Sequence, residues 1–166
     1  MILICYDGST DAKEAIARGA RMLRGQRATV LTVWSPFDTA ALGLSGGVED
    51  MQESDEAGRL HAEHQAEVGA RLAIELGFDA EPRTVDRRTT IADAILGEAD
   101  ALDATAILMG SRGLTGVKSV LLGSVSHAVI QHADRTVIVV PSPEVAAARA
   151  RKHRTEGVAP ASSSSS

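Results

Sequence analysis

The residues of this chain best suited to chemistry lie in the segment 109–126, MGSRGLTGVKSVLLGSVS. Gly110 and Gly113 carry no Cβ, so the backbone at both positions can come close to a ligand. Residues 123–125 stand at the start of a predicted helix, where free N–H groups and the positive end of the helix dipole favour phosphate. Ser124 adds a hydroxyl donor. This segment therefore predicts binding of a phosphate-bearing ligand.

A second polar turn, Asp7-Gly8, directly follows the apolar run 2–6 (ILICY), which is predicted to be the first strand. The glycine segment follows the apolar run 105–109 (TAILM), which is predicted to be the fourth strand. In an open parallel sheet, ligands bind beyond the carboxyl ends of the strands, where the strand order reverses. We therefore expect Asp7-Gly8 to face the same crevice as the glycine segment.

The elements that position these residues alternate along the chain. The predicted strands are residues 2–6, 28–34, 80–86, 105–109 and 136–140, and the predicted helices are 12–23, 53–76, 91–102 and 124–132. Ser9, Thr10 or Asp11 caps the first helix, and Thr90 caps the third. Alternation of buried strands with helices predicts an α/β fold, a doubly wound five-stranded parallel sheet of order 3-2-1-4-5 with helices on both faces. The more polar third strand is expected at an edge.

The domain is expected to span residues 1–143, and residues 144–166 are expected to form a disordered Ala/Arg/Ser-rich tail ending in five serines. A short helix over residues 143–154 is the alternative for the start of this tail. Residues 145–166 carry four basic residues and one acid, so the net charge of −5 leaves −8 on the rest of the chain. We interpret the tail charges as solvated.

Composition excludes several function classes. Aromatic residues make up only 2% of the chain, too few for a platform that stacks nucleic-acid bases or sugars. The negative net charge gives no basic footprint, so no nucleic-acid partner is expected. No apolar run approaches the roughly 20 residues that span a membrane, so no membrane partner is expected. Cys5 is the only cysteine, which suits a reducing cytoplasm, and its apolar surroundings predict an inert thiol.

Three motifs together resemble the universal stress protein family. The spacing Gly110-x2-Gly113-x9-Gly123-Ser124 is similar to that family's nucleotide-binding signature. The opening ILICYDGST and the closing VIVVP resemble its first and last strands, so the resemblance covers residues 1–141. The resemblance implies the adenine nucleotide alpha hydrolase-like form of the doubly wound fold, and a role in stress response or regulation.

The resemblance also implies ATP as the ligand, with or without Mg²⁺. Asp7 would lie near the base and ribose, and the backbones of Tyr6 and Val33 near adenine. The residues around ribose and phosphate would be Met109, Gly110, Ser111, Arg112 and Gly113, and those holding the phosphates Gly123, Ser124 and Val125, assisted by Ser126. Tyr6 departs from the family, which usually has a smaller residue there; its ring either narrows the base pocket or points into the core.

Members of the family commonly pair through the last strand. Residues 136–140 (TVIVV) have the composition of a sheet edge that is costly to leave unpaired. The resemblance therefore implies a homodimer in which two such strands meet antiparallel.

No motif supplies catalytic groups or metal ligands. Gly116-Val117-Lys118-Ser119 lacks the spacing of a P-loop, and His61 and His64 have no third ligand in an evident motif. Ser124 and His127 lack an Asp in the expected order of a triad. Hydrolysis of ATP is therefore expected to be slow at most. A slow ATPase, a cyclic-AMP-binding protein and a nucleotide-free dimeric scaffold remain the alternative functions.

Overall fold

The computed structural model describes residues 1–36, 48–113 and 122–147. Five strands form one sheet: β1 (Ile2–Cys5), β2 (Arg27–Trp34), β3 (Asp79–Asp86), β4 (Ala106–Gly110) and β5 (Thr136–Val140). Their order is β3-β2-β1-β4-β5, and every neighbouring pair is parallel. This confirms the predicted topology, including the place of the polar third strand at an edge.

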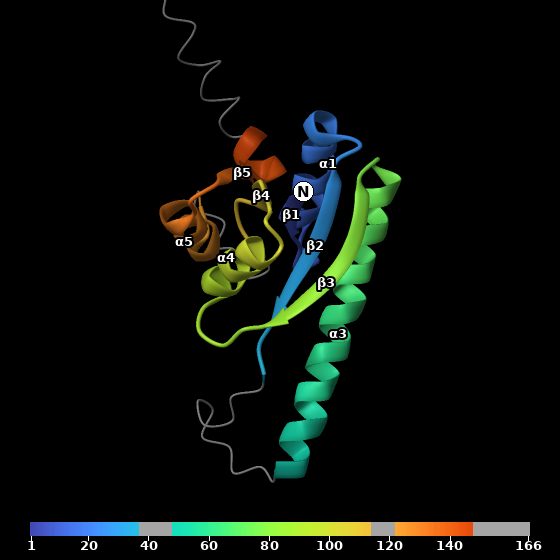
Figure 1. Ribbon diagram of the computed structural model, residues 1–166, viewed down its shortest axis with the longest axis vertical. Coiled ribbons are helices and arrows are strands. Elements are labelled where there is room, and N and C mark those ends of the chain that lie inside the picture. Colours follow the sequence, from blue (N-terminus) through green and yellow to red (C-terminus); the bar gives the residue numbers. More distant parts are fainter. Residues whose placement is uncertain (37–47, 114–121, 148–166) are drawn as a thin grey trace, which may run out of the picture.

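Helices cover both faces of this sheet (Figure 1). They are α1 (Thr10–Leu23), α3 (Val48–Glu75), α4 (Ile91–Ala101) and α5 (Ser124–His132). One core cluster joins Ile2 and Ile4 of β1 to α1 and α3, and the other joins Leu3 to α4 and α5. Successive strand residues point to opposite faces, so β1 contributes to both clusters and is apolar throughout.

Polar caps fix where two of the helices begin. Ser9 is the N-cap of α1, and its Oγ accepts the Ala12 N–H at 3.1 Å. Thr90 caps α4 in a capping box, in which Asp93 bonds back to the Thr90 N–H. The sequence left three candidates for the first cap, and the structure selects Ser9.

Element ends differ from the predictions at several places. Strand β1 ends at Cys5, one residue before the predicted end at Tyr6. The helix predicted from residue 53 begins at Val48, because residues 48–52 contain no glycine or proline to interrupt it. Strand β4 continues to Gly110, which pairs with Val140, so Gly110 is the last strand residue and not a loop residue. The loop that follows β4 therefore begins at Ser111.

The C-terminal end of the described chain continues past the last strand. Residues 143–147 are helical, and Val145 is 9% exposed. The Val145 N–H donates to Ser142 Oγ at 3.2 Å, so Ser142 caps this turn. The helix considered over residues 143–154 is thus present over 143–147, and residues 148–166 lie outside the described part.

Tyr6 lies in the core between the sheet and α3. Its ring is 2% exposed and belongs to the cluster under α1 and α3. A Cβ on Gly69 of α3 would lie 2.7 Å from Tyr6 Cδ1 and 2.9 Å from Val30 Cγ1. Of the two orientations considered for Tyr6, the structure therefore has the one in the core, where the absence of a side chain at Gly69 makes room for the ring.

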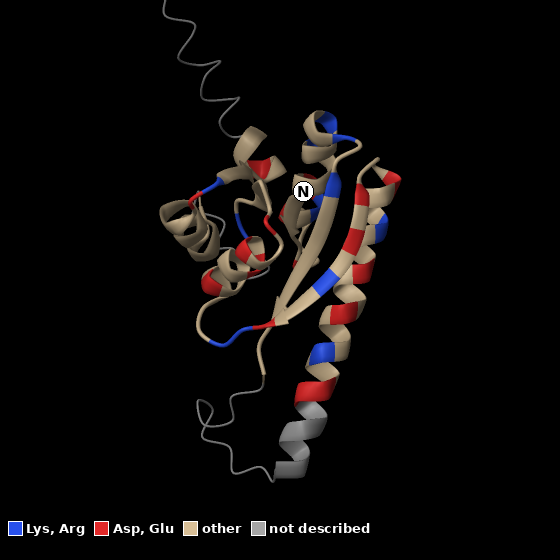
Figure 2. Cartoon of the chain, in the orientation of Figure 1, with Lys and Arg blue, Asp and Glu red and all other residues tan. Residues whose placement is uncertain are grey.

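The charged residues lie mainly on the outer surfaces of the elements. Figure 2 shows Lys and Arg interspersed with Asp and Glu along α3 and β3. Ion pairs such as that of Arg59 with Glu56 on α3 are exposed and contribute little to stability. Within the described residues, no helix has the length and apolarity needed to cross a membrane.

The packing of Tyr6 against Gly69 yields a stability prediction. Gly69→Ala should lower the free energy of unfolding by about 1–3 kcal/mol, because the new methyl group overpacks the core. Gly97→Ala is the matched control in α4, where nothing lies within 4 Å of a Cβ. It should raise the free energy of unfolding by about 0.5–1 kcal/mol. Urea denaturation followed by circular dichroism measures both; a Gly69→Ala variant as stable as the wild type would contradict this packing.

Candidate functional site

The carboxyl ends of β1 and β4 lie side by side because these strands pair in parallel, Ile4 opposite Leu108. Asp7 follows β1, and Gly113 follows β4 after two residues of loop. A Cβ on Gly113 would lie 2.7 Å from Asp7 Oδ2, closer than side chains normally approach. The fold therefore brings together the two segments that the sequence predicted to lie at one edge, and with any other residue at position 113 the Asp7 carboxylate would have to shift.

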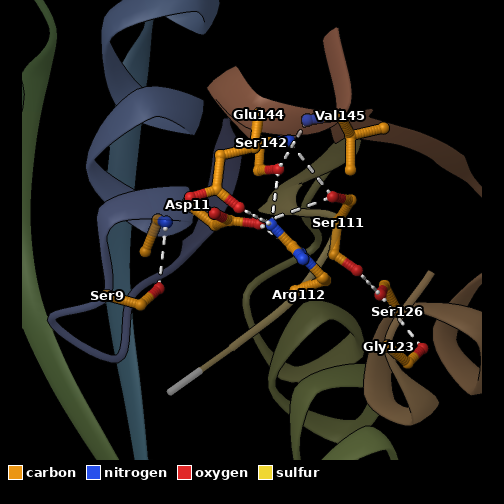
Figure 3. Close-up of polar contacts among 10 residues, drawn as sticks. Ser9, Asp11, Ser111, Arg112, Gly123, Ser126, Ser142, Glu144 and Val145 are labelled. Carbon is orange, nitrogen blue, oxygen red and sulfur yellow. Dashed lines mark hydrogen bonds and ion pairs between the residues drawn. The ribbon is translucent and has the colours of Figure 1, made fainter. Parts of the chain in front are cut away.

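The start of α5 lies against the same loop (Figure 3). The Gly123 N–H donates to the Ser111 carbonyl at 2.7 Å, and a Cβ on Gly123 would lie 3.4 Å from Arg112 Cα. Gly123 is the N-cap of α5 and has no side chain to accept the first helical N–H groups. Among the described residues no side chain caps these groups, and a phosphate is suited to that position.

The three serines of this region have different surroundings. Ser124, the first residue of α5, is exposed. Ser126 is buried, and its Oγ donates to the carbonyls of Ser111 at 2.8 Å and Gly123 at 3.2 Å. Ser111 is also buried, and its Oγ accepts the Ser142 N–H at 3.3 Å. Ser124 thus offers the solvent-facing hydroxyl, whereas Ser111 and Ser126 hold the loop against the helix.

Arg112 points into the protein. Its side chain is 8% exposed, and its Nη2 lies 2.6 Å from Ser142 Oγ and 3.7 Å from Glu144 Oε2. Its Nε lies 3.5 Å from Asp11 Oδ2 in the first turn of α1. The sequence offered this guanidinium as a cation for phosphate; in the structure its charge is compensated internally by Asp11 and Glu144. Lys118, the other cation of the segment, lies outside the described residues.

The predicted base-side residues contribute mainly backbone and packing. The Tyr6 N–H donates to the Leu31 carbonyl at 2.9 Å, and its carbonyl accepts from Thr32 Oγ1 at 2.9 Å. Val33 and Met109 both pack into the cluster beneath α4 and α5. The Tyr6 peptide groups are therefore already bonded within the sheet, so its predicted backbone contact with adenine would have to share them.

The titratable groups at the end of β1 are unsuited to nucleophilic chemistry. Burial, together with the negative charge of Asp7, raises the pKa of the Cys5 thiol to about 12. The same two causes raise the pKa of Tyr6. Asp7 Oδ1 accepts the Ser9 N–H at 3.0 Å, which fixes the turn after β1. Among the described residues no group of three or more His, Cys, Asp or Glu side chains could hold a metal ion.

Sequence reasoning missed two residues of this region. Asp11 was considered only as a helix cap, and Ser142 was given no role, although both contact Arg112. They lie far apart in the chain, and only the pairing of β4 with its neighbours brings them together. A buried arginine must be paired, but the sequence does not show which arginine is buried.

The architecture defines a class: a doubly wound α/β domain with a glycine-bearing segment at the carboxyl edge of its sheet. The model of the universal stress protein family matches residues 1–141, and the chain belongs to that family. A universal stress protein of Thermus aquaticus, that of the QAH/OAS sulfhydrylase 3'region, is 32% identical over 142 residues, covering 84% of this chain and 96% of the relative.

Solved structures of the same fold agree with this assignment. The hypothetical protein MJ0577 superposes with a TM-score of 0.70 at 25% identity, covering 84% of this chain and 94% of its own. A universal stress protein in complex with cAMP gives 0.60 at 20% identity, with 85% and 96% covered. One from Archaeoglobus fulgidus in complex with dAMP gives 0.59 at 23% identity, with 83% and 94% covered.

The raised pKa of Cys5 predicts a slow thiol. At pH 8 alkylation by iodoacetamide should be roughly a thousandfold slower in the folded protein than in urea, where the pKa is about 8.5. Because the folded pKa is the higher, the unfolded chain releases its proton first as the pH rises. The free energy of unfolding should therefore fall above about pH 8.5, and by less in Cys5→Ala. Equal alkylation rates in folded and unfolded protein would contradict the shift.

Proposed function

We propose that this universal stress protein binds ATP where the carboxyl ends of β1 and β4 meet, with or without Mg²⁺, and acts in regulation or stress response. The observation that carries the proposal is that the loop after β4, which contains Gly113, lies next to the start of α5. The two are joined by the hydrogen bond from the Gly123 N–H to the Ser111 carbonyl. Backbone N–H groups at such a junction bind phosphate without a surplus of positive charge. This suits a chain whose net charge is −5.

In this proposal each residue has a definite part. Ser124 and Val125 hold the phosphates through their N–H groups and the exposed Ser124 hydroxyl, and Gly123, whose own N–H is bonded to the Ser111 carbonyl, lets the phosphates come close to the helix start. Gly110 and Gly113 let the chain pass close to ribose and phosphate. Gly110 also makes room for α1, since a Cβ there would lie 2.9 Å from the Asp11 backbone. Asp7 and the backbones of Tyr6, Val33 and Met109 form the base and ribose side. Ser111, Arg112 and Ser126 shape the site from behind, through the contacts described above.

Two alternatives use the same position. Universal stress proteins of this fold have been solved with cAMP and with dAMP. These structures favour an adenine nucleotide as the ligand, and binding measurements must decide how many phosphates it carries. A slow ATPase at this position would release phosphate from bound ATP, and the loss of that release in Gly113→Val would favour it over binding alone. A site for ATP is filled only in a compartment that contains ATP, so we expect the protein in the cytoplasm.

Glycine variants test the proposal. Isothermal titration calorimetry should show that the wild type binds ATP, whereas Gly113→Val raises Kd at least about tenfold because its side chain displaces the Asp7 carboxylate from the base and ribose side of the proposed site. Gly123→Val should have a similar effect at the start of α5. Gly97→Ala, in open space on α4, is the control and should bind as the wild type does. Titration with cyclic AMP in parallel separates the two ligands, and a wild type that binds neither at millimolar concentration refutes the proposal.

We also propose that the protein is a homodimer through β5. This strand lies at the edge of the sheet, and its outer edge is bonded to no other described strand. Val137, Ile138 and Val139 are only partly buried. An apolar edge of this kind is normally covered, and an antiparallel copy of itself would bury it.

Light scattering over a dilution series tests this pairing. The wild type should have twice the monomer mass and dissociate on dilution. Val137→Pro should shift the equilibrium towards monomer, because proline removes a strand N–H that a partner could bond. Circular dichroism checks that the variant is folded. A mass equal to the monomer at every concentration would contradict the dimer.

A further inference from the structure

The side chain of Arg112 joins the loop of the proposed site to the C-terminal end of the described chain. Arg112 lies between Ser111 and Gly113, at the start of that loop, and its guanidinium reaches Ser142 and Glu144 beyond β5 (Figure 3). The region that matches the family ends at residue 141, so both partners lie outside it. The contact therefore joins the region that matches the family to residues that follow it.

Apart from Glu144, whose side chain is 68% exposed, the contact is built from buried, mutually bonded groups. Arg112 and Asp11 are 8% and 12% exposed, and Ser142 is 1% exposed. Ser142 bonds in three directions: its Oγ accepts from Arg112 and from the Val145 N–H, and its N–H donates to Ser111 Oγ. An arginine removed from water is stable only while its partners stay in place. Departure of residues 142–147 would leave Arg112 with Asp11 as its one ionic partner among the described residues, and would expose Val145.

The same contact sets the position of the loop. The Ser111 N–H donates to the Val140 carbonyl at 2.8 Å, and the Ser111 carbonyl accepts from Gly123 and Ser126. The Arg112 guanidinium is bonded on the side of the loop that faces away from α5, and this keeps the Arg112 backbone next to Gly123. The same restraint keeps Gly113 close to Asp7. Lysine cannot reproduce this, because it lacks the planar fork that reaches several partners at once.

We propose that Arg112 is a positioning residue, and that docking of residues 142–147 on Arg112 and nucleotide binding at the adjacent loop favour one another. This inference rests on the proposed function, because it concerns the regulation of that same site. Coupling of this kind is reciprocal: if the docked segment orders the loop for ATP, then bound ATP must hold the segment in place by the same factor. A partner or modification that displaces the segment would thereby release the nucleotide.

The first test measures ATP affinity by calorimetry. Arg112→Lys and Ser142→Ala should each raise Kd for Mg-ATP, by roughly tenfold. Arg135→Lys is the matched control: Arg135 is also largely buried, with Nη1 bonds to the carbonyls of Ala99 and Ala104, at the other end of β5. This control should lose stability but keep the wild-type Kd. An equal loss of affinity in all three variants would overturn the inference, since the effect would then follow stability alone.

The second test is a readout that a merely structural role would not change. Hydrogen–deuterium exchange of the Ser142, Val145 and Ala146 amides should slow when ATP is added to the wild type. The slowing should be absent in Arg112→Lys. The amides of Leu102 and Ala104 at the end of α4 are the control and should not respond. A wild type that binds ATP without this protection overturns the coupling and leaves the proposed function intact; a wild type that does not bind ATP removes both.

Discussion

The arrangement of the carboxyl edge of the sheet depends on the hydrogen bonds that the backbone N–H and carbonyl of Ser111 make. Its N–H continues the sheet to Val140, and its carbonyl accepts both the Gly123 N–H and the Ser126 hydroxyl. One residue thus ties together the end of β4, the end of β5 and the start of α5. A buried backbone group must find a partner, and here the partners are the elements that the site needs side by side.

Around this contact, the absence of side chains matters as much as their presence. A Cβ at Gly113 would collide with Asp7, and one at Gly123 would be tight against the Ser111 carbonyl. Each glycine lets two segments approach that the parallel order of the sheet has already made neighbours. The resulting edge presents N–H groups and the Ser124 hydroxyl, and these can attract an anion although the protein is acidic overall.

The remaining polar side chains of the segment support this arrangement from behind. Ser126 and Ser111 are bonded inward, and the Arg112 charge is taken up by Asp11 and Glu144. Their distribution separates the exposed edge, where we propose that the nucleotide binds, from a buried layer that fixes its shape. A binding loop keeps a defined geometry only when a supporting layer of packed and hydrogen-bonded side chains holds it. The C-terminal turn takes part in that layer, which connects it to the site.

The sequence alone determined the strand order and most element bounds, because short β-branched runs alternate with capped helical stretches and parallel crossovers leave few topologies. It also determined which segments lie at the carboxyl edge, since the ends of parallel strands meet there. Tertiary structure decided the rest. Tyr6 turned to the core because Gly69 leaves it room, and Arg112 turned inward because Asp11 and Ser142 meet it there. The direction in which a side chain points depends on neighbours that are distant in the chain, and the local spacing of residues does not show which neighbours these are.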